Sequence, residues 1–417
     1  MKVYVTALGC KLNQSEAESW ARRLAAAGFD IVTDPAAADL HIVNTCAVTR
    51  EAARKSRQKV RRCARSNAQA SLIVTGCFAE IAPAQAAALP GVDLVLGTAD
   101  KEQLVERIAG QYGIAPSPSA CQDWRLTTEH TRAFVKIQDG CDNACTYCIV
   151  RIARGPQRSR PMSEVLNEIA AREHEGYQEI VLTGVHIGAY GRECGESLAS
   201  LVQAVLNSTR LPRLRLSSIE PWDLSPGLLE LWQDPRLCRH LHLPLQSGCD
   251  ATLARMNRRY STAQYKDLVC RAREAIPGLA VTTDVIVVFP GENEEEFRSS
   301  VAFAGEMEFA RMHVFPFSAR PGTSAAVMPG QVPAAKKTQR VAEMCAVSRR
   351  SSLAFRGSFL GGTMDVLWEN GKAERWSGLT GNYIRIWTSS VENLANRILP
   401  TRLVQVVGDG MIGELVL

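Results

Sequence analysis

The sequence lacks the features of membrane-spanning and secreted proteins. No stretch approaches the ~18 consecutive apolar residues that a membrane-spanning helix needs. The chain begins with the alternating pattern Lys2-Val3-Tyr4-Val5, which is typical of a strand and differs from the apolar core of a signal peptide. We therefore expect a cytoplasmic protein that has no membrane partner.

The chain also lacks the characteristics of a disulfide framework. Its 13 cysteines are an odd number spread over 417 residues, whereas disulfide frameworks are typical of short secreted domains. A reducing compartment with metal ligation is favoured instead. Hydrophobic residues make up 46% and charged residues 22% of the chain, which is ordinary for globular proteins, and the length predicts roughly two to four domains.

Acidic residues are nearly absent from residues 50–65. This segment has eight basic residues against Glu51 alone, although the net charge of the whole chain is only +5. Most charge runs are solvated helix faces, but a helix with so few acidic partners repels itself unless a polyanion neutralises it. We predict that one stripe of this helix contacts a nucleic-acid backbone. The stripe consists of Arg50, Arg54, Arg57, Arg61 and Arg65.

Three apolar, β-branched runs each end in a cysteine. They cover residues 3–10, 40–46 and 71–77 and end at Cys10, Cys46 and Cys77. Helical patterns separate them, which predicts an open parallel α/β sheet whose strands end at one edge. A single free cysteine is more often a small buried hydrophobic residue, and thiols also bind zinc. The shared position in three units favours an iron–sulfur cluster. Ser15 and Glu18 predict a capping box for the first helix.

A second set of cysteines has the spacing CxxxCxxC. Cys141, Cys145 and Cys148 follow a strand-like run at residues 133–137. Three thiolates cannot fill the four positions of a tetrahedral metal or ligate all four irons of a [4Fe–4S] cluster. This spacing therefore predicts a cluster with one iron open to chemistry.

Six strand-like runs alternate with helical patterns in the centre of the chain. They cover residues 133–138, 179–183, 213–217, 240–243, 281–288 and 313–317. The alternation predicts a parallel sheet, either a partial (β/α)6 barrel or a doubly wound sheet. In both folds ligands bind at the carboxyl ends of the strands. We therefore expect cofactor contacts from Thr183, Gly184, Ser217, Ser218, Glu220, Gln246 and Ser247.

Arginines crowd the segment that follows the CxxxCxxC loop. Arg151, Arg154, Arg158 and Arg160 lie there, and we expect them either to steer substrate phosphates or to pair with nearby carboxylates, with steering slightly favoured. The same two alternatives, phosphate steering or pairing with carboxylates, apply to Arg255, Arg258 and Arg259.

The last sixty residues have a different character. Five short strand-like runs, at residues 363–369, 372–378, 382–388, 402–407 and 411–416, predict a small antiparallel, OB-like barrel, with a hairpin turn at Asn370-Gly371. Tyr383, Arg385 and Trp387 share one face of a strand. Such a row suits stacking of RNA bases, although a barrel core could also bury these aromatics.

These motifs resemble the radical S-adenosylmethionine superfamily, in which an aromatic residue, here Tyr147, precedes the last cysteine of CxxxCxxC. The resemblance implies that Tyr147 contributes to cofactor binding. The resemblance is closer to the methylthiotransferase family, through residues 8–14, 44–46, 75–77, 242–248 and 289–292. Residues 182–187 and 215–221 resemble the branch that acts on N6-threonylcarbamoyladenosine at position 37 of tRNA. The C-terminal segment resembles the RNA-binding TRAM domain.

The resemblance implies a domain order and a chemistry. It implies a methylthiotransferase domain at 1–112, a linker at 113–129, a partial (β/α)6 radical barrel at 130–350 and a TRAM domain at 356–417. Two [4Fe–4S] clusters would be ligated by the two cysteine triads. S-adenosylmethionine would supply both a radical and a methyl group, and a methylthio group would be added to C2 of the adenine. The expected partners are tRNA and a low-potential electron donor such as flavodoxin or ferredoxin, and we expect a monomer.

Three alternatives remain open. Two keep the chemistry and change the substrate to isopentenyladenosine in tRNA or to an aspartate of a ribosomal protein. The third is a non-catalytic iron–sulfur protein that binds RNA and senses redox state. The remaining cysteines have no motif role, and we interpret them as packing or adventitious thiols. They are Cys63, Cys121, Cys194, Cys238, Cys249, Cys270 and Cys345.

Overall fold

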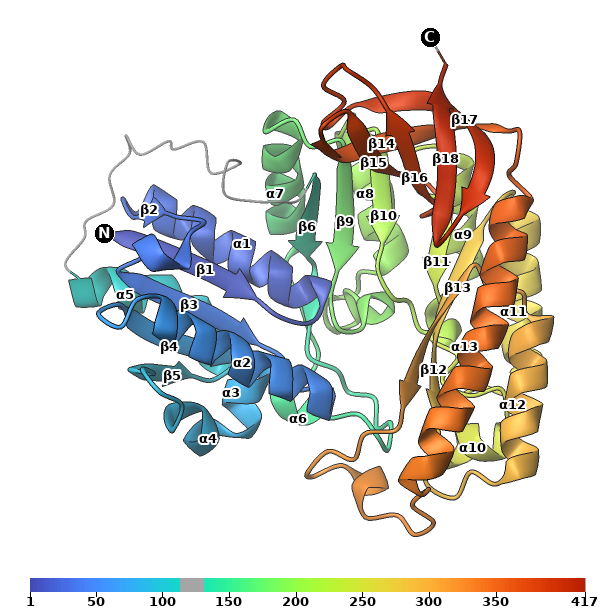
Figure 1. Cartoon of the computed structure of the whole chain (residues 1–417), viewed down its shortest axis with the longest axis horizontal. Coiled ribbons are helices and arrows are strands. Elements are labelled where there is room, and N and C mark those ends of the chain that lie inside the picture. Colours follow the sequence, from blue (N-terminus) through green and yellow to red (C-terminus); the bar gives the residue numbers. More distant parts are fainter. Residues whose placement is uncertain (113–130, 417) are drawn as a thin grey trace. The chain divides into compact units, whose positions relative to one another are not determined.

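The computed structural model describes residues 1–112 and 131–416 of the chain (Figure 1). The predicted linker at 113–129 lies outside these residues. The described chain forms two compact units. The first combines the N-terminal segment with Asp139–Arg158 and Ser318–Ala326, and the second contains His130–Gln138, Ser159–Phe317 and Val327–Leu417. No helix within the described ranges is long and apolar enough to cross a membrane.

The first unit is built on an open parallel sheet, which confirms the prediction. Its strand order is β2-β1-β3-β4-β5, and every pairing is parallel. The strands are β1 Lys2–Ala7, β2 Asp30–Ile31, β3 Leu40–Thr45, β4 Ser71–Gly76 and β5 Leu94–Leu96. The helices are α1 Lys11–Ala26, α2 Arg50–Ser66, α3 Cys77–Ile81, α4 Pro83–Ala87, α5 Leu104–Tyr112 and, from the cysteine-loop segment, α6 Val150–Arg154.

Helix α1 begins earlier than the sequence suggested. Cys10 is its N-cap, so Ser15 and Glu18 are buried inside the helix and the predicted capping box is wrong. Only three residues separate β1 from α1, and Cys10 takes the N-cap position without a side-chain capping hydrogen bond. This turn places a thiol at the amino end of a helix.

Six parallel strands of the second unit follow one another in chain order. They are β6 Arg132–Lys136, β9 Glu179–Thr183, β10 Arg213–Leu216, β11 His240–His242, β12 Ala280–Val287 and β13 Arg311–Pro316. They form two three-stranded parallel sheets, and parallel bridges between residues 214 and 237 and between 218 and 242 connect β10 to the β11 side. This arrangement confirms the predicted partial (β/α)6 barrel. A short pair, β7 Gln138–Asp139 with β8 Arg158–Ser159, flanks the cysteine loop.

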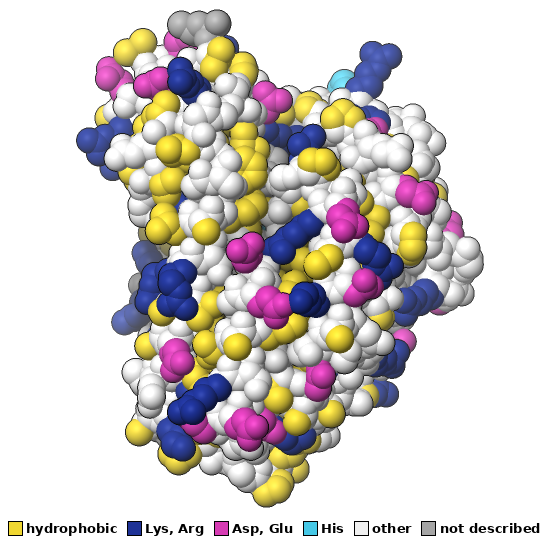
Figure 2. Space-filling model, turned by 90° about the vertical axis from the view of Figure 1, so that its right-hand side faces the viewer, with side chains coloured by type: hydrophobic (Ala, Val, Ile, Leu, Met, Phe, Trp, Pro, Cys, Tyr) yellow, Lys and Arg dark blue, Asp and Glu magenta, His cyan; other side chains and the backbone are white. Residues whose placement is uncertain are grey.

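Helices follow the strands of this partial barrel. They are α7 Met162–His174, α8 Leu198–Ser208, α9 Pro226–Glu230, α10 Asp250–Arg255, α11 Thr262–Ala275, α12 Glu294–Glu306 and α13 Ala334–Gly357. Figure 2 shows the molecule from the side of α11, α12 and α13, where basic and acidic side chains are interspersed. Pairs such as Arg271 with Asp267 and Arg298 with Glu294 lie on these helices. The described residues of this face therefore form no continuous basic surface for RNA.

The chain ends in a closed five-stranded β-barrel, as predicted. The strands β14 Thr363–Lys372, β15 Arg375–Thr380, β16 Arg385–Ser389, β17 Ile398–Val407 and β18 Gly410–Leu415 close in the order β14-β15-β16-β18-β17. The expected antiparallel pairing is wrong for β16 and β18, which pair in parallel, since β18 runs antiparallel to β17 and closes the barrel against β16. The predicted turn at Asn370-Gly371 is wrong, because both residues belong to β14 and pair with residues of β15 after a bulge. Ala373 and Glu374 make the turn instead, with φ values of 48° and 64°.

Candidate active site

The structure brings Cys10, Cys46 and Cys77 together in the first unit. Cys10 caps α1, Cys46 follows β3, and Cys77 is the first residue of α3. The three thiols are close enough that the pKa of Cys46 is influenced by both of the others. At Gly9, whose φ is +98°, an added Cβ would lie 2.7 Å from the Cys46 Sγ. Only a glycine at this position allows the backbone to lie so close to the Cys46 thiol.

The basic helix α2 helps to hold this triad. Its buried Ser56 accepts a hydrogen bond from the Cys46 N–H at 3.0 Å and donates one to the Cys46 carbonyl at 2.9 Å. Burial raises the pKa of Cys46 to about 11. Desolvation also raises the pKa of Cys10, although Arg154 opposes this effect. Binding of a metal at these thiols would therefore release protons, and the charge of the metal would compensate for the burial of the Cys46 and Cys77 thiolates.

Arg154 is a buried cation beside the same thiols. It donates to Glu16 at 3.0 Å and to Asp139 at 2.8 Å, and its other terminal nitrogen donates to Asn13. Burial opposes its charge, but Glu16, Cys77 and Asp139 together keep its pKa well above the ordinary value. Glu16 also accepts a 2.6 Å hydrogen bond from Lys101. Arg154 thus pairs with carboxylates, and the preference for phosphate steering is wrong for this residue.

The second triad lies on a loop that its own backbone holds in shape. The Cys141 N–H donates to the Gly155 carbonyl at 3.2 Å, and the Cys148 N–H donates to the Cys145 carbonyl at 3.1 Å. At Gly140, whose φ is +69°, an added Cβ would lie 1.8 Å from the Pro156 carbonyl oxygen. All three thiols are half-buried, as is Tyr147. Three thiols on a preformed loop are a donor set that fits a [4Fe–4S] cluster with an open iron.

The strand ends of the second unit carry several of the predicted cofactor residues. Thr183 is buried at the end of β9. An added Cβ at Gly184 would lie 2.9 Å from the Gln138 carbonyl oxygen, so the backbone is tightly packed here. Ser217, directly after β10, is buried, and its hydroxyl has no partner among the described residues. A buried hydroxyl without a partner is costly, which suits a ligand contact at this position.

Two strained residues follow the next strands. Gln246 has φ 64° and Val288 has φ 58°, and a β-branched residue rarely adopts this conformation. The Val288 N–H donates to the buried Glu292 carboxylate at 2.6 Å, and Glu292 pairs with Arg340 at 2.9 Å. Sequence reasoning missed Val288, because a valine before Phe-Pro-Gly carries no signal of a left-handed backbone. Ser247 is buried, and its hydroxyl accepts from a backbone N–H.

Other predicted residues are engaged within the protein. Glu220 forms an ion pair with Arg258, and Ser218 bridges to β11 through its backbone. Arg160 pairs with Glu168 at 2.6 Å. These pairs, and that of Arg255 with Glu296, support the carboxylate alternative over phosphate steering.

The predicted basic helix forms, and its arginines differ in exposure and in ion pairing. Arg54 is paired with Glu51 on the same helix. Arg57 is half-buried, with its guanidinium 5.7 Å from the centre of the Phe78 ring. The more exposed residues are Arg50, Arg61, Arg62 and Arg65. RNA contact by this helix remains a prediction.

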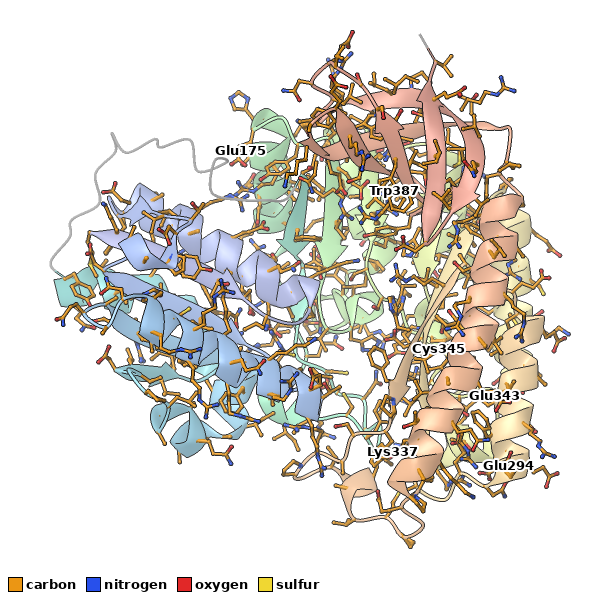
Figure 3. All side chains as sticks on the ribbon, viewed as in Figure 1. Glu175, Glu294, Lys337, Glu343, Cys345 and Trp387 are labelled. Carbon is orange, nitrogen blue, oxygen red and sulfur yellow. The ribbon has the colours of Figure 1, made fainter. Side chains whose placement is uncertain are left out.

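Only part of the predicted aromatic row of the C-terminal barrel is accessible for stacking on RNA bases. Tyr383 precedes β16 and is covered by the Arg215 guanidinium, 3.9 Å from the ring centre, while Arg132 donates to its hydroxyl at 2.8 Å. Tyr383 is therefore an internal contact, which corrects its assignment as an RNA-stacking residue. Arg385 and Trp387 lie on β16 and are half-exposed; Figure 3 labels Trp387 on the C-terminal barrel.

The other cysteines vary in exposure. Cys63 and Cys238 are buried, Cys249 and Cys345 are half-buried, and Cys194 and Cys270 are exposed. Cys121 lies outside the described residues. Their interpretation as packing or adventitious thiols stays a prediction.

Comparison with known proteins identifies the family. Residues 2–97 match the model of an uncharacterized protein family, UPF0004, and residues 135–304 match the radical SAM superfamily. The threonylcarbamoyladenosine tRNA methylthiotransferase MtaB of Thermotoga maritima is 38% identical over 376 residues, which cover 88% of this chain and 86% of that protein. This chain belongs to the radical SAM methylthiotransferase family. The MtaB of Bacillus subtilis is 37% identical over 420 residues, 95% of this chain and 92% of that protein.

The family includes relatives with a different named product. A tRNA-2-methylthio-N(6)-dimethylallyladenosine synthase of Pelobacter propionicus is 32% identical over 432 residues, 99% of this chain and 98% of that protein. Among solved structures, the radical S-adenosylmethionine methyltransferase TsrM of Kitasatospora setae has a TM-score of 0.60 at 14% identity and covers 78% of this chain and 74% of its own. That likeness concerns the fold. As a radical SAM methylthiotransferase, the protein is an enzyme of a family that uses a [4Fe–4S] cluster and S-adenosylmethionine.

Proposed function

We propose that this protein adds a methylthio group to C2 of N6-threonylcarbamoyladenosine at position 37 of tRNA. In this proposal Cys141, Cys145 and Cys148 hold the cluster that binds S-adenosylmethionine, and Cys10, Cys46 and Cys77 hold a second [4Fe–4S] cluster. The observation that carries the proposal is the grouping of Cys10, Cys46 and Cys77 at three strand ends in a chain that also has the CxxxCxxC loop.

The protein's own residues would bind and orient the reactants. The bound clusters and S-adenosylmethionine supply the radical that removes hydrogen from the adenine C2 and the sulfur and methyl group that replace it. The buried Ser217 hydroxyl and the strained backbone at Gln246 would position S-adenosylmethionine. Arg154 offsets the negative charge that accumulates on Cys10 and Cys77 when they are deprotonated. A low-potential donor such as flavodoxin or ferredoxin would supply the electron.

The proposal is tested by the nucleosides that the enzyme makes. Reconstituted protein, dithionite and S-adenosylmethionine are incubated with tRNA carrying threonylcarbamoyladenosine or dimethylallyladenosine, and digested nucleosides are analysed by mass spectrometry. We expect a methylthio product from the first tRNA. A product from the dimethylallyl substrate alone would instead assign the second function, which is favoured by the relative from Pelobacter propionicus.

A further inference from the structure

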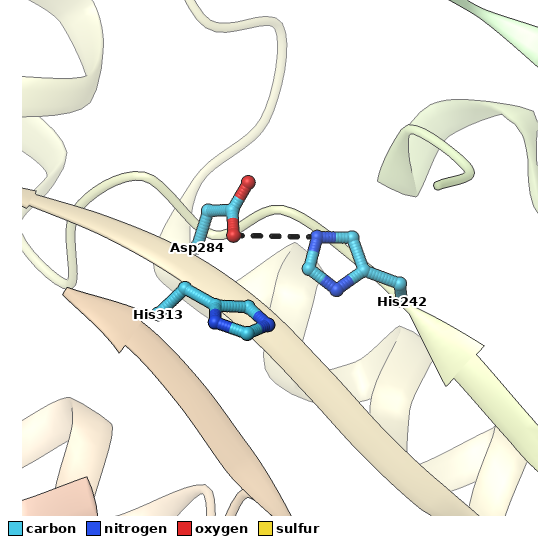
Figure 4. A group of neighbouring side chains, drawn as sticks. All are labelled: His242, Asp284 and His313. Atoms are coloured by element: carbon cyan, nitrogen blue, oxygen red, sulfur yellow. Dashed lines mark ion pairs between the residues drawn. The ribbon is translucent and has the colours of Figure 1, made fainter. Parts of the chain in front are cut away.

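A group of three potential metal ligands lies away from all six of these cysteines in sequence. His242, Asp284 and His313 come from the neighbouring parallel strands β11, β12 and β13 (Figure 4). Their ligand atoms lie within 4.8 Å of one another. Asp284 is directly opposite His313 in the strand register, and His242 is opposite Thr282, two residues before Asp284 on the same face. Strand pairing therefore fixes the group.

The group lies on the polar face of its sheet. On β12, Val281, Val285 and Val287 point to the other face and are almost completely buried. Asp284 is only partly buried, and His313 is exposed. The charged and imidazole groups are thus directed away from the apolar core and remain reachable by an ion or a ligand.

Hydrogen bonding orients the His242 ring. Its Nδ1 lies 3.0 Å from the Thr282 hydroxyl, which also lies 3.0 Å from the His240 Nε2. The Nε2 of His242 then faces Asp284, at 3.5 Å from the carboxylate oxygen. A hydrogen bond to the second ring nitrogen is what usually orients metal-binding histidines.

The separation of the ligand atoms suits a shared ion. A distance of 3.5 Å between His242 and Asp284 is long for a direct hydrogen bond. Two ligands about 2.1 Å from a tetrahedrally coordinated metal lie roughly 3.4 Å apart. The imidazole centres of His242 and His313 are 6.0 Å apart. Rotation of the exposed His313 side chain would therefore bring its ring nitrogen to the same ion as His242 and Asp284.

We propose that His242, Asp284 and His313 bind a divalent transition-metal ion that keeps coordination positions open. Two imidazoles and one carboxylate are a ligand set for iron, manganese, cobalt or zinc, and three protein ligands leave positions for substrate oxygens. The site is separate in chemistry from the cysteine triads because it contains no thiolate.

Charge indicates which kind of ligand binds at the open coordination positions of the ion. Without an ion, Asp284 repels a second carboxylate, whereas a divalent ion makes the group positive. The threonylcarbamoyl substituent has a carboxylate and a hydroxyl, whereas a dimethylallyl group has neither. In an extension that rests on the proposed function, the ion binds the carboxylate and hydroxyl of the substituent and so selects the substrate.

The first experiment measures the ion itself. Mn²⁺ is titrated into the reconstituted protein and followed by electron paramagnetic resonance, because Mn²⁺ prefers carboxylate and imidazole to thiolate. We expect one tightly bound Mn²⁺ with nitrogen hyperfine coupling. Asp284→Asn and His313→Ala should each weaken binding roughly tenfold or more, with folding checked by circular dichroism. The exposed His174→Ala is the matched control. Absence of binding, or equal binding in all variants, overturns the site.

The second experiment tests the substituent. Anticodon stem-loops carrying threonylcarbamoyladenosine or dimethylallyladenosine are compared for affinity with and without Mn²⁺. We expect Mn²⁺ to tighten binding of the first RNA only, and His313→Ala to abolish that gain. An equal effect on both RNAs overturns the substrate extension. Failure of the proposed function would appear separately, as loss of the expected methylthio product while Mn²⁺ binding persists.

Discussion

Individual residues around the first triad show how buried charge would support the proposed second cluster. Cys10 and Cys77 lie at the amino ends of helices, and Arg154 is directed to the same place. Helix amino ends and a buried guanidinium both stabilise thiolates. Arg154 is itself stabilised by Glu16 and Asp139. Changes at these positions should therefore affect both stability and chemistry.

Replacing Arg154 should destabilise the first unit. Arg154→Gln removes the cation that pairs with Asp139 and Glu16 and that donates to Asn13, so we expect the free energy of unfolding to fall by about 3–5 kcal/mol. Urea unfolding at neutral pH measures the change. The control is Arg151→Gln, an exposed arginine on the same short helix α6. Equal effects of the two substitutions would show that the buried pairs contribute nothing.

The two triads should separate into two activities. Cys145→Ala removes a ligand of the proposed radical cluster, so cleavage of S-adenosylmethionine and methylthiolation should both stop. Cys10→Ala should keep the cleavage and stop the sulfur transfer. Chromatography of 5′-deoxyadenosine and mass spectrometry of tRNA measure the two steps, with Cys270→Ala, an exposed thiol outside the triads, as control. If Cys10→Ala and Cys145→Ala behaved alike, the division between triads would be wrong.

At the scale of elements, α2 has two faces of different character. One face buries Ala53, Ser56, Val60 and Cys63 against the sheet, and Ser56 clamps Cys46. The other face carries exposed arginines. A substrate phosphate bound there would lie on the same helix that positions a cysteine of the triad.

Neutralising the exposed end of α2 should weaken RNA binding. With Arg61, Arg62 and Arg65 changed to Gln, we expect lower tRNA affinity and a salt slope reduced by roughly 0.9 for each phosphate that the helix no longer neutralises. Filter binding between low and moderate salt measures the slope. The control changes Lys266, Arg271 and Arg298 to Gln, since these residues pair with acids on α11 and α12. If the salt dependence of tRNA affinity were unchanged, the exposed face of α2 would be a solvated helix face that does not contact RNA.

The sequence predicted elements better than the details of their ends. Repetition located the parallel strands and the first triad, and the CxxxCxxC spacing located the second, because period and spacing are local properties. The Asn370-Gly371 turn was wrong because a bulge in β14, which depends on pairing with β15, moved the turn. Tyr383 was misassigned because its partners, Arg132 and Arg215, are more than 150 residues away in sequence. The proposed metal-ligand group on β11, β12 and β13 was not predicted, because its residues are brought together only by the pairing of three strands.

At the scale of the whole second unit, one buried acid organises the junction between the partial barrel and the C-terminal barrel. Glu179 is fully buried and pairs with Arg215 at 2.6 Å. Arg215 and Arg213 donate to carbonyls of the C-terminal barrel, among them those of Gly381 and Leu379. The contacts lie toward the amino ends of β9 and β10, opposite the strand ends that carry the proposed cofactor residues.

The last prediction concerns the pH dependence of this junction. Burial alone would raise the pKa of Glu179, but Arg215, with Arg132 and Arg213, lowers it to about 2. Because the folded pKa lies below the ordinary value, the stabilisation is complete above about pH 4.5 and is lost as the pH falls toward 2. Glu179→Gln should therefore lower the free energy of unfolding by about 3–5 kcal/mol at pH 6, and the difference from the unmodified protein should shrink below pH 4.5.

Urea unfolding followed by tryptophan fluorescence between pH 6 and pH 3 measures that difference, since Trp368 is buried in the C-terminal barrel. The exposed Glu274→Gln controls for loss of a carboxylate as such. A difference that stayed constant with pH would mean that Glu179 acts by packing alone. If it shrinks as expected, the junction depends on the charge of one carboxylate, and the C-terminal barrel should loosen from β9 and β10 when that carboxylate is protonated.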